Sequence, residues 1–161
     1  MDWHQLFNMQ KKLDTYIETK RGIADQDVFS EKCLALLTEL GELANETRCF
    51  KFWSTKERSE QAVILEEYVD GIHFILSLGL DKGYGFTKED IPHPNLSEIE
   101  QFHAVFAASV AFKNEPTEAN YKNMFISYLQ LGKLLGFSEG DIQRAYMEKN
   151  AKNYQRQNEG Y

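Results

Sequence analysis

Residues 57–80 constrain the fold most strongly, because apolar side chains recur there too densely for a helix with one face in water. A helix of this composition is buried, so the rest of the chain has to pack around it. Glu67 and Asp70 interrupt the apolar run at positions where a purely structural helix would carry Leu or Ala. The stretch therefore predicts a largely buried helix that carries carboxylates among its apolar residues.

Apolar residues recur at steps of three and four along most of the chain, and no segment shows the two-residue alternation of a half-buried strand. Ser97 followed by Glu100 fits a capping box, and Ser30 and Ser138 are predicted N-caps of two further helices. We expect an all-α bundle of about six helices, over residues 3–19, 29–48, 57–80, 98–112, 117–135 and 138–156. Residues 79–94 are rich in Gly, Pro, Asp and Lys and predict a surface loop.

The length and composition predict one domain over residues 1–161, since 161 residues with 42% hydrophobic content suffice for a single core. The 25 acidic residues against 18 basic ones give a net charge of −7, which argues against a nucleic-acid-binding surface. Cys33 and Cys49 form no CxxC pattern, so a disulfide framework or zinc site is not expected. No signal peptide and no apolar run of about 18 residues occurs, so we expect a cytoplasmic protein.

A second acidic pair, Glu39 and Glu42, lies in the predicted helix 29–48. In each pair the acids are three residues apart, which places them one turn apart on one side of a helix. Either pair alone would more often lie on a solvated surface, but two pairs on neighbouring helices gather four carboxylates, a ligand set that suits Mg²⁺ or Mn²⁺. Glu66 lies one turn before Asp70 and is an alternative to Glu67.

A stripe of polar side chains lies on one face of the last predicted helix, where Lys149, Asn153 and Arg156 occupy positions i, i+4 and i+7. Two cations and an amide on one face can hold phosphate oxygens and a sugar hydroxyl. The alternative is structural, because basic residues near the end of a helix favourably oppose its macrodipole. The stripe alone does not decide between these readings.

Four stretches carry a resemblance to a known family, namely residues 10–14, 39–42 with 44–47, 66–74 and 149–161. Over nearly its whole length the chain resembles the dimeric all-α dUTPases, relatives of the MazG-like nucleotide pyrophosphohydrolases. The acidic pairs match the wider superfamily, whereas the motif at Gln10 and the ending Lys-Asn-x-x-Asn-x-x-Arg-Gln match the dUTPases. The resemblance implies a homodimer that hydrolyses dUTP to dUMP and pyrophosphate with Mg²⁺, with dUDP as a further candidate substrate.

The resemblance also implies roles for individual residues, with Glu39 orienting or deprotonating the attacking water. The implied metal ligands are Glu39, Glu42, Glu67 and Asp70. The implied contacts to the uracil base are Gln10, Asp14, Trp53 and Phe74. The implied contacts to phosphate and sugar are Lys56, Lys149, Asn153 and Arg156. The chain departs from some members at Asp14, where they have Asn, and at Phe52 and Ser54, where they have Trp and Lys in a Lys-Trp-Trp-Lys motif.

Two alternatives remain beside dUTP hydrolysis. The same metal site could serve a pyrophosphohydrolase of another nucleotide, such as dCTP or a non-canonical triphosphate. A helical interaction module without catalysis is the other class, and the intact set of four carboxylates argues against it.

Aromatic residues make up 13% of the chain, and we expect several to lie in a homodimer interface: Phe106, Phe112, Phe125 and Tyr128.

Overall fold

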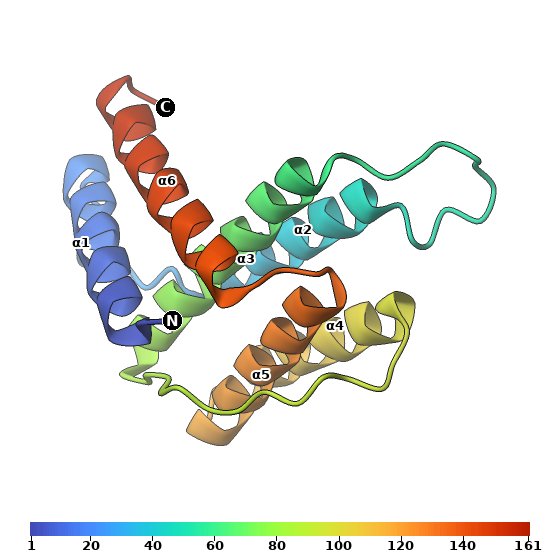
Figure 1. The fold of residues 1–161 in the computed structure, drawn as a ribbon. Helices are drawn as coiled ribbons and strands as arrows, with labels where there is room; N and C mark the ends of the chain where they lie inside the picture. The colour runs from blue at the N-terminus through green and yellow to red at the C-terminus, as the bar shows by residue number, and fades with distance from the viewer.

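The computed structural model describes all residues from 1 to 161 and contains six α-helices and no strand, which confirms the predicted all-α class (Figure 1). The helices are α1 (Trp3–Arg21), α2 (Phe29–Thr47), α3 (Gln61–Lys82), α4 (Glu98–Asn114), α5 (Glu118–Leu134) and α6 (Glu139–Asn158). In Figure 1, α2 and α3 lie side by side, α1 and α6 lie toward one end of this pair, and α4 and α5 form a second pair. None of the six is both long and apolar enough to cross a membrane.

Helix α3 is the centre of the bundle, since it packs against α1, α2, α5 and α6. Ile64, Ile72 and Leu76 are fully buried, as the dense apolar pattern predicts. The helix begins at Gln61, later than predicted, because the preceding residues belong to the extended connection from α2. It continues to Lys82 and ends at Gly83, whose φ of 74° is the left-handed conformation of a helix C-cap. The first residues of the predicted loop 79–94 are therefore helical.

Local capping chemistry determines where several helices begin. Ser97 and Glu100 form the predicted capping box of α4, and the Ser138 side chain caps α6. The prediction for Ser30 is wrong, because α2 begins one residue earlier, at Phe29. Val28 occupies the N-cap position and makes no side-chain capping bond, and the Asp27 side chain accepts a hydrogen bond from the Phe29 backbone N–H at 3.0 Å.

A pair of tyrosines holds α3 against α5. The Tyr68 hydroxyl donates to the backbone oxygen of Tyr128 at 2.9 Å, and the Tyr128 hydroxyl donates to that of Tyr68 at 2.6 Å. The stacked rings fit against Gly71 and Gly132, and a Cβ at either glycine would collide with a tyrosine hydroxyl. These reciprocal bonds satisfy both buried hydroxyls and fix the position of α3.

The predicted interface role of three aromatic residues is wrong. Phe112, Phe125 and Tyr128 are fully buried within the single chain, where Phe125, for example, packs edge-on against Trp3 with 4.8 Å between ring centroids. Of the four residues predicted to lie in the interface, only Phe106 is partly exposed. The aromatic content therefore fills the core of the bundle, and the homodimer stays a prediction that these three residues do not support.

Candidate functional site

Three carboxylates meet where α2 lies along α3. Glu39 comes from α2, and Glu67 and Asp70 come from one side of α3. One oxygen of each lies within 4.8 Å of the others, so that the three could ligate one ion. The spacing of three residues places Glu67 and Asp70 one helical turn apart, as predicted. We call Glu39, Glu67 and Asp70 the carboxylate cluster.

The other two acids considered as ligands lie outside the carboxylate cluster. Glu42 is exposed, and it lies close enough to Glu39 to raise the pKa of that carboxyl. Glu66 instead forms ion pairs with Lys149 and Lys152. The structure therefore places Glu67, and not Glu66, beside Glu39.

Burial and mutual repulsion disfavour negative charge on the carboxylate cluster. Burial, the charge of Asp70 and the contact with Glu42 raise the pKa of Glu39 to about 8. Burial, followed by the charges of Asp70 and Glu42, raises the pKa of Glu67 to about 7. The Oε2 atoms of both glutamates are buried without a hydrogen-bond partner. Hard oxygen donors that lack partners and repel one another fit a divalent cation such as Mg²⁺ or Mn²⁺.

Lys149 of α6 borders the cluster and is only 8% exposed. Its Nζ lies 3.0 Å from Oδ2 of Asp70 and 3.0 Å from Oε1 of Glu66. Burial opposes its charge, but the contacts with Asp70 and Glu66 prevail and raise the pKa of Lys149. Lys152 and Lys149 in turn lower the pKa of Glu66 to about 2. A permanent positive charge therefore lies at the edge of the carboxylate cluster.

A cavity of about 380 Å³ joins the cluster to residues of α1 and α6. Its volume lies in the range of small-molecule sites. The predicted residues that line it are Glu39, Asp70, Gln10, Asp14, Phe74, Lys149, Asn153 and Arg156. Residues far apart in the sequence, predicted to bind metal, base, and phosphate or sugar, thus surround one space. We call it the nucleotide cavity, after the ligand that these residues are predicted to bind.

Four predicted residues do not line the cavity, namely Glu42, Glu67, Trp53 and Lys56. Glu67 belongs to the carboxylate cluster, and Glu42 lies close to Glu39. Trp53 and Lys56 belong to the connection between α2 and α3, which projects from the bundle in Figure 1, and neither lines the nucleotide cavity. The Trp53 side chain is 65% exposed and contacts the rings of Phe50 and Phe52. Their roles in binding base and phosphate stay predictions.

A chain of buried hydrogen bonds, which the sequence did not reveal, lies behind the cavity. Ser77 Oγ donates to Asp14 Oδ2 at 2.7 Å, and Gln10 Nε2 donates to Asp14 Oδ1 at 2.8 Å. Gln10 Oε1 lies 2.6 Å from His73 Nδ1 and accepts from the Tyr146 hydroxyl at 2.8 Å. Both the nitrogen and the oxygen of the Gln10 carboxamide therefore already form hydrogen bonds within the protein. His73 and Ser77 also line the cavity, and the only sequence signal for them was polar residues within an apolar run.

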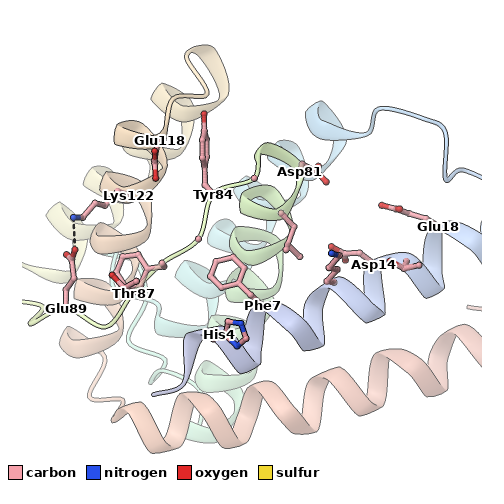
Figure 2. A pocket seen from close by; sticks show the side chains of 16 residues that line it. His4, Phe7, Asp14, Glu18, Asp81, Tyr84, Thr87, Glu89, Glu118 and Lys122 are labelled. Atoms are coloured by element: carbon pink, nitrogen blue, oxygen red, sulfur yellow. Dashed lines mark ion pairs between the residues drawn. The ribbon is translucent and has the colours of Figure 1, made fainter.

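A larger cavity, of about 860 Å³, lies among α1, the end of α3, the connection that follows and α5 (Figure 2). Asp14 and Glu18 line both cavities, but no member of the carboxylate cluster lines the larger one. Lys122 and Glu89 form an ion pair, with 2.6 Å between the charged atoms, on the side of this cavity that lies away from α1 (Figure 2). Volume alone therefore does not make it the functional site, since the candidate catalytic groups surround the smaller cavity.

Similarity to one known family extends over nearly the whole chain. A family model described as dUTPase matches residues 2–161. No curated protein matches the chain. The chain therefore belongs to the all-α dUTPase family, and the predicted dUTP diphosphatase activity is confirmed.

Proposed function

We propose that this dUTPase uses Glu39, Glu67 and Asp70 to hold Mg²⁺, with Glu42 completing the ligand set from the edge. The observation that carries the proposal is the pair of buried, unpartnered Oε2 atoms on Glu39 and Glu67. An acceptor without a partner is costly to bury, and a hard divalent cation would satisfy both atoms and relieve the repulsion within the cluster. Mn²⁺ has similar ligand preferences and is the expected substitute.

Bound Mg²⁺ would neutralise charge on the triphosphate and increase the acidity of a coordinated water. Within the chain, Glu39 orients the attacking water and accepts its proton. Its position fits this role, because Glu39 lines the nucleotide cavity and keeps one oxygen free of protein partners.

Lys149 and Arg156 bind the phosphates and stabilise the charge that develops on the departing pyrophosphate. Both line the nucleotide cavity, and Lys149 lies beside Asp70, next to the proposed point of attack. The guanidinium of Arg156 offers paired donors suited to phosphate oxygens. Asn153, on the same face of α6, binds the sugar hydroxyl.

The uracil ring binds against Gln10, Asp14 and Phe74, which also line the cavity. Participation of Trp53 and Lys56 requires the connection between α2 and α3 to approach a nucleotide cavity, in this chain or in a second copy. A homodimer in the cytoplasm, without nucleic acid as a partner, completes the proposal, and the net charge of −7 is consistent with the last point.

A substrate panel tests the proposal. dUTP, dUDP and the four canonical deoxynucleoside triphosphates are incubated with the protein in Mg²⁺, in Mn²⁺ and in EDTA, and the products are separated by chromatography. We expect dUMP and pyrophosphate from dUTP in either metal and no turnover in EDTA. Full activity in EDTA would refute the metal site, and turnover of dTTP equal to that of dUTP would refute the uracil specificity.

A further inference from the structure

We propose that Glu66 is a positioning residue, which draws Lys149 away from Asp70 so that this carboxylate can bind the metal ion. Lys149 and the metal then compete for Asp70, and Glu66 shifts that competition in favour of the metal. The inference rests on the proposed function and deepens it, because it gives a role to an acid that lies beside the carboxylate cluster without belonging to it.

The ammonium group of Lys149 lies between two acids of α3. Glu66 and Asp70 are four residues apart, so their side chains project from one side of the helix, one turn apart. Nζ of Lys149 lies 3.0 Å from Oε1 of Glu66 and 3.0 Å from Oδ2 of Asp70. Because the Lys149 side chain is buried, water does little to solvate its charge. The two carboxylates therefore together neutralise one buried ammonium group.

The two acids differ in exposure and in the spaces that they border. The Asp70 side chain is 16% exposed and lines the nucleotide cavity. The Glu66 side chain is 45% exposed and lines a separate groove of about 400 Å³ between α3 and α6. Lys149 lines both spaces. Glu66 thus contacts Lys149 from the groove and does not itself line the nucleotide cavity.

The alternative is that Glu66 forms only an ordinary surface ion pair. Its Oε1 atom also accepts from the half-exposed Lys152 at 2.9 Å, and an exposed pair of this kind contributes little to stability. The contact with Lys149 differs, because that ammonium group is buried and also contacts a candidate metal ligand. Without Glu66, the only acid within ion-pair distance of Lys149 would be Asp70.

A divalent cation and Lys149 cannot both bind Asp70 at full strength. Hard cations hold carboxylate oxygens at short distances, so an ion on Asp70 would lie close to an ammonium group that remained 3.0 Å from Oδ2. Two cations that share one carboxylate in a partly buried site repel each other. Glu66 offers Lys149 a negative charge that the carboxylate cluster does not use. Lys149 is therefore expected to move toward Glu66 when Asp70 binds the metal.

Mn²⁺ binding to the full-length protein without nucleotide tests this competition. Electron paramagnetic resonance detects free Mn²⁺, and titrations at one fixed pH give the Kd of each variant. We expect Lys149→Gln to lower this Kd by about 3- to 10-fold, because the competing cation is removed. We expect Glu66→Gln to raise the Kd by a similar factor, because Lys149 then depends on Asp70 alone. A Kd that is unchanged in Lys149→Gln would overturn the inference.

Each substitution has a matched control. Lys152→Gln removes a neighbouring positive charge that contacts Glu66 but not Asp70. Glu148→Gln removes an exposed acid that lines the same groove without forming an ion pair with either lysine. Both controls should change the Kd for Mn²⁺ by about twofold or less. Changes as large as those of the test variants would show that only the net charge of the region matters, and would overturn the inference.

A double-mutant cycle separates an action through Lys149 from a direct attraction between the Glu66 charge and the metal. If Glu66 acts by positioning Lys149, Glu66→Gln should change the Kd by less than about twofold in the Lys149→Gln background. The same loss of Mn²⁺ affinity in both backgrounds would overturn the inference. The stoichiometry of each titration reports the folded fraction, so a partly unfolded variant does not distort the Kd.

The Mg²⁺ requirement for dUTP hydrolysis gives a second readout. We expect Glu66→Gln to need more Mg²⁺ for half-maximal activity than the wild-type protein. A lower kcat with an unchanged Mg²⁺ requirement would show a purely structural role and would overturn the inference. Wild-type protein that binds no Mn²⁺ would instead refute the proposed metal site, so the failure of the inference and the failure of the proposed function are distinguishable.

Discussion

The ammonium group of Lys149 lies 3.0 Å from Oδ2 of Asp70, so a cation from α6 already borders the carboxylate cluster. The contact links the element that carries the predicted phosphate-binding stripe to the helix that carries two predicted metal ligands. Lys149 also contacts Glu66, and that second carboxylate keeps it in place beside the cavity.

Lys149→Gln is expected to lower kcat/KM for dUTP by about 10- to 100-fold, since a buried charge would no longer meet the phosphates. Lys152→Gln is the matched control, because Lys152 is 49% exposed and contacts only Glu66. It should change kcat/KM by about twofold or less. Equal losses in the two variants would show that the general charge of α6, and not the position of Lys149, supports activity.

Glu67→Gln should lower kcat by about 100-fold or more while raising the Tm of the metal-free protein. The loss of activity follows from removing a ligand, and the gain in stability follows from removing repulsion with Asp70 and Glu42. The neighbouring Glu66→Gln should show the opposite change in Tm, because contacts with two lysines stabilise the charged form of Glu66. Circular dichroism and steady-state kinetics measure both effects. A lower Tm in metal-free Glu67→Gln would contradict the electrostatic account.

The stability of the metal-free protein should decrease as the pH rises from about 5 to 8. Glu39 and Glu67 have folded-state pKa values of about 8 and about 7, above the ordinary value of 4.5. The folded chain therefore retains protons that the unfolded chain releases, and the stability present below the ordinary value is lost as the pH rises through the folded values. Thermal melts in EDTA across this range measure the slope, and saturating Mg²⁺ should reduce it. A Tm that rises with pH in EDTA would refute the raised pKa values.

Gly71→Ala should destabilise the fold by about 1–3 kcal/mol, because a Cβ would collide with the hydroxyl of Tyr128. Gly41→Ala is a matched helical control, since nothing outside the adjacent backbone of its own helix lies within 4 Å of a Cβ built there. It should stabilise the protein by about 0.5–1 kcal/mol through the higher helix propensity of Ala. Urea unfolding measures both changes. Equal effects would show that the tyrosine pair does not constrain α3.

The sequence predicted all six helices because each buries a face with regular apolar spacing. It missed the start of α3, since the residues before Gln61 share the composition of a helix but form part of an extended connection. It also assigned Phe112 and Phe125 to an interface, although both are fully buried within the chain. The aromatic content shows how much aromatic surface has to be buried. Only the packing of the helices determines whether the core of the chain or a subunit interface buries it.

The site was predictable where it depends on spacing along one helix, as for Glu67 and Asp70. The choice between Glu66 and Glu67 depended on the rotation of α3 relative to α2 and α6, which no local pattern encodes. The position of Trp53 depended on a connection without periodicity. The contacts of His73 were hidden for a similar reason, since they join residues of α1, α3 and α6.

The most direct test of the central claim is anomalous diffraction from crystals soaked with Mn²⁺ and a non-hydrolysable dUTP analogue. The account predicts an anomalous peak coordinated by oxygens of Glu39, Glu67 and Asp70, and the same crystals of Glu67→Gln should show a weaker peak or none. A nucleotide bound in the cavity with no peak among these carboxylates, or with the metal held elsewhere, would contradict it.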